Sequence, residues 1–147
     1  MRPKQQQQSG SGDLFRARLD QIINMRHELV LLAWEIDWAW LDAEVAVLYA
    51  ATGRTAVPSR FILGLLFLKQ THGLSDEQVC ARWICDPYFQ YFTGEEFFRH
   101  ELPHDRSNLT NARQRFGDKL DLFLAETPRV AENSGALKKT DLDRVTG

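Results

Sequence analysis

The segment 60–72 constrains the fold most, because it is apolar on nearly every side. Its centre, residues 61–68, lies between Arg60 and Lys69 and carries no charge. A helix that spans a bilayer needs about 20 apolar residues, so this shorter run predicts a helix in a protein core. A helix without a polar face is normally surrounded by other helices. We therefore expect it at the centre of a helical bundle.

Helix signals also precede this segment. From Asp13 onward, apolar and long side chains recur with a period near 3.6 residues, which predicts helical structure. Asp37 is a suitable N-cap for a following helix, because its carboxylate can accept an unpaired backbone N–H of the first turn. We expect Gly53 to end that helix and Ser59 to cap the apolar one. The periodic positions are Leu14, Arg18, Ile22, Met25, Leu29, Leu32 and Ile36, then Leu41, Val45 and Leu48.

Further helix signals follow the apolar segment. Ser75 and Gln78 have the spacing of a capping box, which opens a helix. Asp86 is the expected cap of the next helix, with Pro87 at its first position. No segment of the sequence predicts a β-strand. The predicted fold class is all-α, a compact multi-helix bundle with a helix-turn-helix-like C-terminal part.

Composition divides the chain into three parts. Residues 1–12 are rich in Gln, Ser and Gly and are expected to be disordered. Residues 13–127 form the expected helical domain, and residues 128–147 are interpreted as a truncated linker. Cys80 and Cys85 are the only cysteines, and the N-terminal residues lack the apolar run of a secretory signal. A reducing cytoplasm is therefore the expected location, without a membrane partner.

The last predicted helix carries the strongest candidate surface. It is expected to begin at Ser107 or Asn108, with Gly117 dividing it from a second helical segment. The side expected to face the core holds Leu109, Ala112, Phe116, Leu120 and Phe123. The opposite side holds Ser107, Thr110, Asn111, Gln114 and Arg115. Hydroxyl, amide and guanidinium groups of this kind can hydrogen-bond to base edges in a major groove.

Charge decides how such a surface could bind DNA. The chain has 18 basic and 20 acidic residues and a net charge of −2, so any nucleic-acid affinity must come from a local patch. Arg99, Arg106 and Arg113 flank the candidate helix and are suited to hold phosphates. Asp118 and Asp121 lie on the same side and confine contact to the first two turns. A solvated helix surface is the alternative interpretation.

Two other groups of residues favour structural interpretations. Cys80, Cys85, His100 and His104 have a spacing near that of a zinc finger. Finger cysteines lie on a β-hairpin, whereas these flank Trp83 in a capped helix, so no metal site is predicted. The aromatic run at residues 88–92 is interpreted as core and not as a stacking platform for bases. The same interpretation applies to Trp34, Trp38 and Trp40.

Catalytic arrangements are few in the sequence. Glu95 and Glu96 form one close carboxylate pair, and Asp141 and Asp143 form another, close to the C-terminus. Both are interpreted as solvated surface. The first pair lies in a loop after Gly94, and residues at a frayed terminus, such as the second pair, do not preorganise a site. No glycine-rich phosphate loop occurs in the sequence. Neither a cofactor nor a small-molecule substrate is therefore predicted.

Several segments, taken in order, resemble the N-terminal domain of bacterial transposases of the insertion-sequence-five type. These segments are Ile36-Asp37-Trp38, residues 60–69, Leu74-Ser75-Asp76-Glu77-Gln78-Val79, Arg82-Trp83, residues 86–92, Gly94-Glu95-Glu96, residues 98–109 and Arg113-Gln114-Arg115-Phe116-Gly117. The resemblance implies an α-helical domain that precedes an RNase-H-like catalytic domain. It also implies contact with transposon-end DNA, or a role in assembly.

The sequence departs from that family at two places. After Leu109 and Thr110 the family usually has a basic residue and a tryptophan, where this chain has Asn111 and Ala112. Residues 141–147 resemble the lead-in to the strand that bears the family's first metal-binding aspartate, which would be expected after the last residue of this sequence. The resemblance therefore implies a transposase truncated before its catalytic residues, and no enzyme activity of its own.

Three hypotheses follow from the sequence. In the first, the chain is a DNA-binding or assembly domain involved in DNA transposition, with duplex DNA at transposon ends as its partner. In the second, it is a protein-interaction module that forms homo-oligomers or pairs with a full-length transposase and inhibits it. In the third, it is an inactive pseudogene product.

Overall fold

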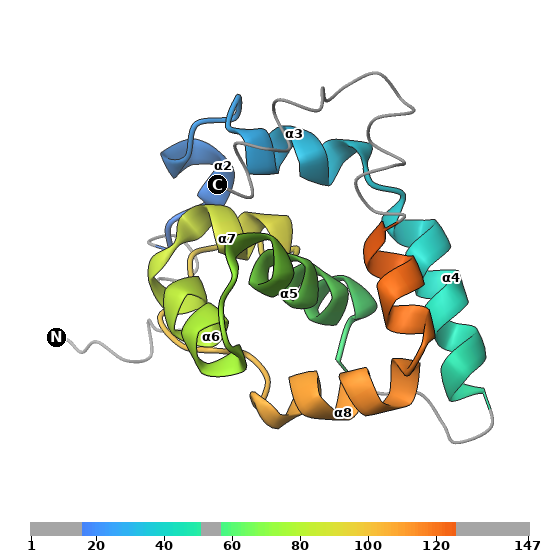
Figure 1. Ribbon diagram of the computed structural model, residues 1–147. Coiled ribbons are helices and arrows are strands. Elements are labelled where there is room, and N and C mark those ends of the chain that lie inside the picture. Colours follow the sequence, from blue (N-terminus) through green and yellow to red (C-terminus); the bar gives the residue numbers. More distant parts are fainter. Residues whose placement is uncertain (1–15, 51–56, 126–147) are drawn as a thin grey trace, which may run out of the picture.

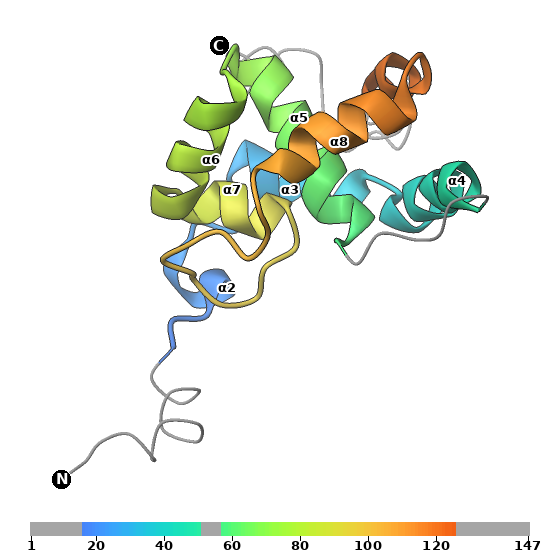
Figure 2. The ribbon, with the colours of Figure 1, turned by 90° about the horizontal axis from the view of Figure 1, so that it is seen from below.

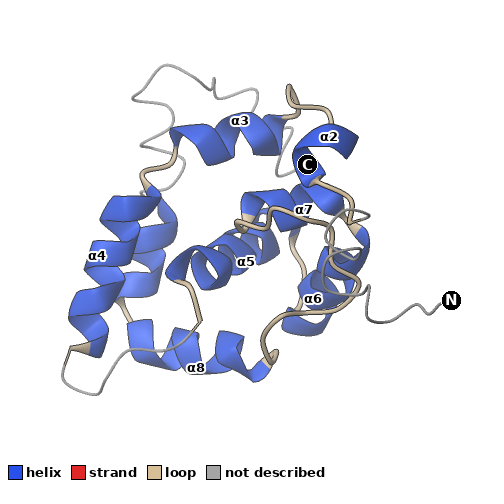
Figure 3. Cartoon of the chain, turned by 180° about the vertical axis from the view of Figure 1, so that it is seen from behind, coloured by secondary structure: helices blue, strands red, loops and turns tan. Residues whose placement is uncertain are grey.

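The computed structural model describes residues 16–50 and 57–125. Within these ranges every regular element is a helix, and Figure 3 shows helices joined by loops without a strand. The predicted all-α fold class is confirmed. The helices are α2 (Leu19–Ile22), α3 (Glu28–Glu35), α4 (Trp38–Tyr49), α5 (Ser59–His72), α6 (Asp76–Cys85), α7 (Pro87–Phe92) and α8 (Ser107–Phe116), and residues 119–125 are also helical.

Helix α5 lies at the centre of the molecule, as its sequence predicts. Figure 1 shows the other long helices arranged around it. Every residue from 61 to 68 is buried, because the helix has no side that can face water. Phe61 packs edge-to-face on Trp83 with ring centroids 5.9 Å apart, and Phe67 stacks on Phe92 at 5.5 Å. The interior is therefore built from α5 and the aromatic side chains of α6 and α7.

The caps predicted at Asp37, Ser75 and Asp86 are confirmed. Asp37 accepts the backbone N–H of Trp40 at 3.0 Å and so caps α4. Ser75 accepts the N–H of Gln78 at 3.0 Å, while the Gln78 side chain accepts the N–H of Ser75 at 2.9 Å. Asp86 accepts two N–H groups of the first turn of α7. These local interactions satisfy donors that a helix start leaves unpaired.

The helical structure predicted from Asp13 to Ile36 is confirmed within the described residues, but it is interrupted. The chain forms two helices there, α2 and α3, and Ile22 is 53% exposed. His27 caps α3 by accepting the N–H of Leu29 at 3.1 Å. The N–H of Asn24 donates to the Tyr88 hydroxyl at 2.8 Å. These interactions take backbone donors that a continuous helix would need, so the helix is broken between Ile22 and Glu28.

Two of the three tryptophans predicted to lie in the core are on the surface. Trp34 is 55% exposed and Trp40 is 40% exposed. Trp34 donates its indole N–H to the Tyr91 hydroxyl at 2.8 Å, which satisfies the polar end of the ring at the surface. Trp38 is partly buried as predicted, with its ring edge-on to Phe92 at 5.5 Å.

The ends of α5 and α8 differ in how well they were predicted. Pro58 and not Ser59 holds the N-cap position of α5, and the Ser59 hydroxyl donates instead to Asp42 at 2.7 Å. Gly117 ends α8 with φ 54°, a conformation that glycine adopts at little cost, as predicted. The expectations for Gly53, for residues 1–12 and 128–147, and for Asp141 and Asp143 lie outside the described residues.

Candidate nucleic-acid interface

Helix α8 lies on the outside of the bundle, across α5. Figure 1 shows it running between the ends of α6 and α4, and Figure 2 shows its outer side along the surface. Leu109, Ala112 and Phe116 are buried, as their spacing predicts. Phe123 is also buried, and Leu120 is partly buried against the core. The polar side chains predicted to face outward are all exposed: Ser107, Thr110, Asn111, Gln114 and Arg115.

Asp105 fixes the start of α8. Its carboxylate accepts the N–H of Ser107 at 2.8 Å, and its backbone carbonyl accepts the N–H of Asn108 at 3.0 Å. The hydrogen bond from the Ser107 N–H lowers the pKa of Asp105 below its usual range. The helix therefore begins at Ser107, one of the two predicted starts, with a carboxylate at its N-terminal end.

The loop that precedes α8 is long. Residues 93–106 separate it from α7, whereas a turn of only three residues, 73–75, joins α5 to α6. The compact helix–turn–helix connection therefore lies between α5 and α6. The start of α6 carries the partly buried Asp76 and the exposed Glu77, and their negative charges repel phosphate. Of the two helices, α8 has the surface chemistry suited to DNA.

Gln90 holds the long loop in place, and sequence reasoning did not single it out. This side chain is fully buried. Its amide accepts the backbone N–H of Arg99 at 2.8 Å and donates to the Arg99 carbonyl at 2.9 Å. It also donates to the carbonyl of Trp83 at 3.0 Å. The approach to α8 is therefore tied to the core by one amide group.

The three arginines predicted to flank the interface each lie beside a carboxylate. Two of these carboxylates come from the first turn of α6 and one from the loop after α7. The pairs are Arg99 with Glu95 at 2.6 Å, Arg106 with Glu77 at 3.9 Å, and Arg113 with Asp76 at 2.7 Å. The side chains of Arg99 and Arg106 are 43% and 54% exposed, so both remain accessible to a phosphate group.

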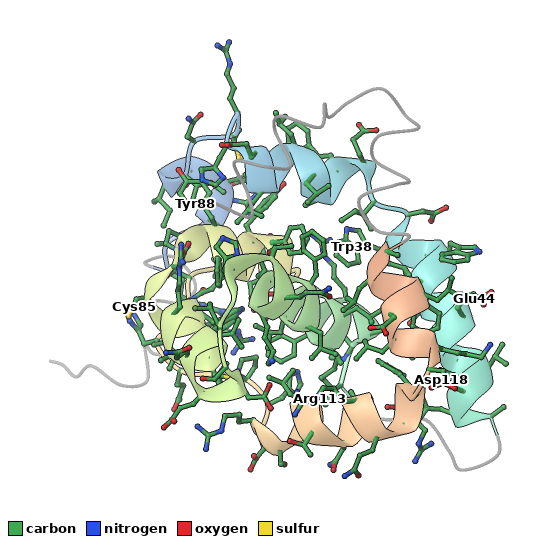
Figure 4. The ribbon with its side chains drawn as sticks, in the orientation of Figure 1. Trp38, Glu44, Cys85, Tyr88, Arg113 and Asp118 are labelled. Carbon is green, nitrogen blue, oxygen red and sulfur yellow. The ribbon has the colours of Figure 1, made fainter. Side chains whose placement is uncertain are left out.

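The Asp76–Arg113 pair is bidentate and joins α6 to α8. Two guanidinium nitrogens donate to the two carboxylate oxygens, each at 2.7 Å. The hydrogen bond from Arg113 lowers the pKa of Asp76, and Lys69, 4.0 Å away, acts in the same direction. Figure 4 shows Arg113 on the side of α8 that faces α5 and α6. Sequence reasoning missed this role for Asp76, which it treated only as part of a helix start.

Arg115 lies on the opposite flank of α8. Its guanidinium carbon is 4.6 Å from the centre of the Tyr49 ring, at the end of α4. Because successive residues of an α-helix are rotated by about 100°, Arg106 and Arg113 share one flank and Arg115 takes the other. The exposed face between these flanks carries Ser107, Thr110, Asn111 and Gln114, which we call the central face of α8.

The residues with zinc-finger spacing have other environments. Cys80 is buried, and burial raises the pKa of its thiol, whereas Cys85 is exposed. The His104 ring packs edge-on to Phe61 at 5.1 Å, and His100 packs on Phe98 at the same distance. Across residues 16–50 and 57–125, no three His, Cys, Asp or Glu side chains are grouped so that they could bind a metal ion. No helix in these ranges is long and apolar enough to cross a bilayer.

Comparison with known proteins connects this geometry to a family. A family model described as "Transposase domain (DUF772)" matches residues 17–115. The chain belongs to this family. The match includes the central face of α8, and it confirms the resemblance to insertion-sequence transposases. The family description links the transposase domain to a function in transposition.

A curated relative matches the chain over nearly its whole length. The uncharacterized protein ORF8 in the nfe locus of Rhizobium meliloti is 44% identical to the transposase-domain chain over 146 residues. The matched region covers 99% of this chain and 70% of that protein. No solved structure matches the chain.

Proposed function

We propose that this transposase domain binds duplex DNA at transposon ends through the central face of α8. The observation that carries the proposal is the exposure of Ser107, Thr110, Asn111 and Gln114 on one side of a helix at the edge of the bundle. An α-helix fits the major groove of B-form DNA, and amide side chains pair with adenine there. We assign binding, and not strand cleavage, to these helices.

Electrostatics suggests where the phosphates lie. Arg106 precedes the first turn of α8 and Arg99 lies in the loop before it, and both side chains are more than 40% exposed. Both can exchange a nearby carboxylate for a DNA phosphate. Asp118 is exposed just after Gly117 and limits contact beyond the end of α8. Because the net charge is −2, we expect weak binding, which added salt weakens further. Element DNA lies in the bacterial cytoplasm, where we propose that the chain acts.

Fluorescence anisotropy with labelled duplexes tests this proposal. One duplex carries a transposon-end sequence and the other the same bases in shuffled order, and both are titrated across a salt series. Replacement of Asn111 and Gln114 by alanine removes the two amides suited to base contacts. A bidentate amide–base pair contributes about 1–3 kcal/mol of discrimination. The double variant is therefore expected to bind the end sequence at least ten-fold more weakly and the shuffled duplex almost unchanged.

Gln70→Ala provides the matched control, because it removes an exposed amide from α5, outside the proposed interface. This variant is expected to bind both duplexes like the unmodified chain. Absence of a complex with either duplex at low salt would contradict the proposed function. Equal losses in the α8 variant and the Gln70 variant would contradict the assignment of the interface to α8.

A second candidate function is association with another transposase chain, either as a homo-oligomer or with a full-length transposase that it would inhibit. One observation favours it. Trp40 and Val47 are 40% and 70% exposed on α4, a helix with apolar residues around its circumference. Exposed apolar patches of this kind occur at protein interfaces. Sedimentation velocity is expected to show a dimer for the unmodified chain and a monomer for Val47→Glu; a monomer in both samples contradicts this candidate.

A further inference from the structure

The flanks of α8 are held by two different neighbouring helices. On one flank, two guanidinium nitrogens of Arg113 donate to the carboxylate of Asp76 at the start of α6. On the other flank, Arg115 lies over the ring of Tyr49 at the end of α4. The central face of α8 lies between these two contacts and takes part in neither.

The Asp76–Arg113 contact constrains the rotation of α8 about its own axis as well as the distance between α8 and α6. A guanidinium fork paired with two carboxylate oxygens is planar and directional, unlike a single point contact. Apolar packing alone constrains α8 less, because only Leu109, Ala112 and Phe116 are buried and the middle one is small. The ion pair therefore adds orientation that the apolar side of the helix does not supply.

We infer that Asp76 and Arg113 are positioning residues for DNA binding: their ion pair sets the rotation of α8, so that the central face points outward. The inference rests on the proposed function and deepens it. Arg113 acts through helix placement and not as a phosphate ligand. Asp76, although it carries a negative charge beside the interface, supports DNA binding.

A positioning role for Arg113 and a direct phosphate contact by Arg113 predict opposite effects of Asp76→Asn on DNA binding. If Arg113 contacted phosphate, Asp76→Asn would remove a competing carboxylate and strengthen DNA binding. If the pair positions α8, the same substitution weakens DNA binding, because the bidentate contact is lost. Arg113→Gln weakens binding in both cases. Only the loss of a phosphate contact changes the salt dependence, by about one unit in the slope of log K against log salt.

The experiment is a double-mutant cycle on the full chain, with anisotropy titrations over a salt series. Asp76→Asn and Arg113→Gln are each expected to weaken binding roughly five-fold with an unchanged salt slope. The double variant is expected to bind like either single variant, because the second change has no pair left to break. Glu77→Gln is the matched control. It removes the same charge one residue further along α6, where the acid is 81% exposed and 3.9 Å from Arg106, and it is expected to strengthen binding.

Amide hydrogen exchange of α8 provides a readout that does not depend on DNA. Exchange within α8 is expected to accelerate equally in Asp76→Asn, Arg113→Gln and the double variant, while α5 stays protected. Stronger DNA binding by Asp76→Asn, a smaller salt slope for Arg113→Gln, or unchanged exchange in α8 would each overturn the inference. If the unmodified chain binds no DNA, the proposed function fails, and the exchange result then decides whether the pair orients α8.

Discussion

Gln90 illustrates how one buried amide can determine the path of a loop. The backbone of Arg99 presents an N–H and a carbonyl to it, and the carbonyl of Trp83 lies on its other side. Of the side chains similar in size, only an amide offers an acceptor and two donors at once. Gln90 therefore satisfies three backbone groups in the core while holding the loop that leads to α8.

Replacement of Gln90 by methionine keeps most of the volume and removes all three hydrogen bonds. Both Arg99 backbone groups then lose their partner in the core, and the Trp83 carbonyl keeps only the backbone N–H of Asp86, at 3.4 Å. We expect this loss to cost about 2–4 kcal/mol of unfolding free energy. Urea denaturation followed by circular dichroism measures this. Gln70→Met, at an exposed site of α5, is the control and is expected to change the unfolding free energy by less than about 0.5 kcal/mol. Similar values for the two variants would contradict the role of Gln90.

Sequence could have indicated that Gln90 is buried, but not what it binds. Aromatic residues flank it on both sides in a helix of only six residues. A single amide in such a run has little access to water, and a buried amide needs partners. Its partner Arg99 lies in a loop without periodicity, so no sequence pattern identified that contact.

At the scale of elements, α5 and α7 are in close contact because Gly64 has no side chain. A Cβ at this position would lie 2.9 Å from Cγ2 of Thr93, just after α7. Thr93 is itself held in place, since its hydroxyl accepts the indole N–H of Trp83 at 2.8 Å and donates to the Phe89 carbonyl. Arg60 adds a second connection by donating to two carbonyls at the end of α7.

Gly64→Ala tests this close contact. Alanine favours a helix over glycine by about 1 kcal/mol, but here the added methyl group displaces Thr93. We expect a net loss of about 1–3 kcal/mol of unfolding free energy, typical of an overpacked core. Adding Thr93→Ser removes Cγ2 while keeping the hydroxyl, and it should restore part of the loss. A more stable Gly64→Ala variant, measured by thermal unfolding, would contradict close packing at this site.

Helix boundaries could be predicted from the sequence where the interactions that determine them lie close together in the chain. The caps at Asp37, Ser75 and Asp86 were predictable because donor and acceptor lie within three residues of one another. The break between α2 and α3 was not, because the apolar period continues across it. One of the contacts that fix this break comes from Tyr88, far along the chain.

At the scale of the whole molecule, the sequence predicted what is buried better than what is adjacent. An apolar helix requires neighbours, so the central place of α5 followed from its composition, as did the buried side of α8. The Asp76–Arg113 pair could not be predicted, because its partners are 37 positions apart and each reads as an ordinary surface charge. The exposure of Trp34 and Trp40 was missed for the same reason: it depends on which helices cover them.

The placement of the central face of α8 has a consequence for how such domains diversify. Thr110, Asn111 and Gln114 lie outside the core, while the side chains that keep their helix in place lie on its other sides. Exchanges at these three positions therefore carry little folding penalty. Under the proposed function, such exchanges alter the DNA sequence that the domain contacts and leave its scaffold unchanged.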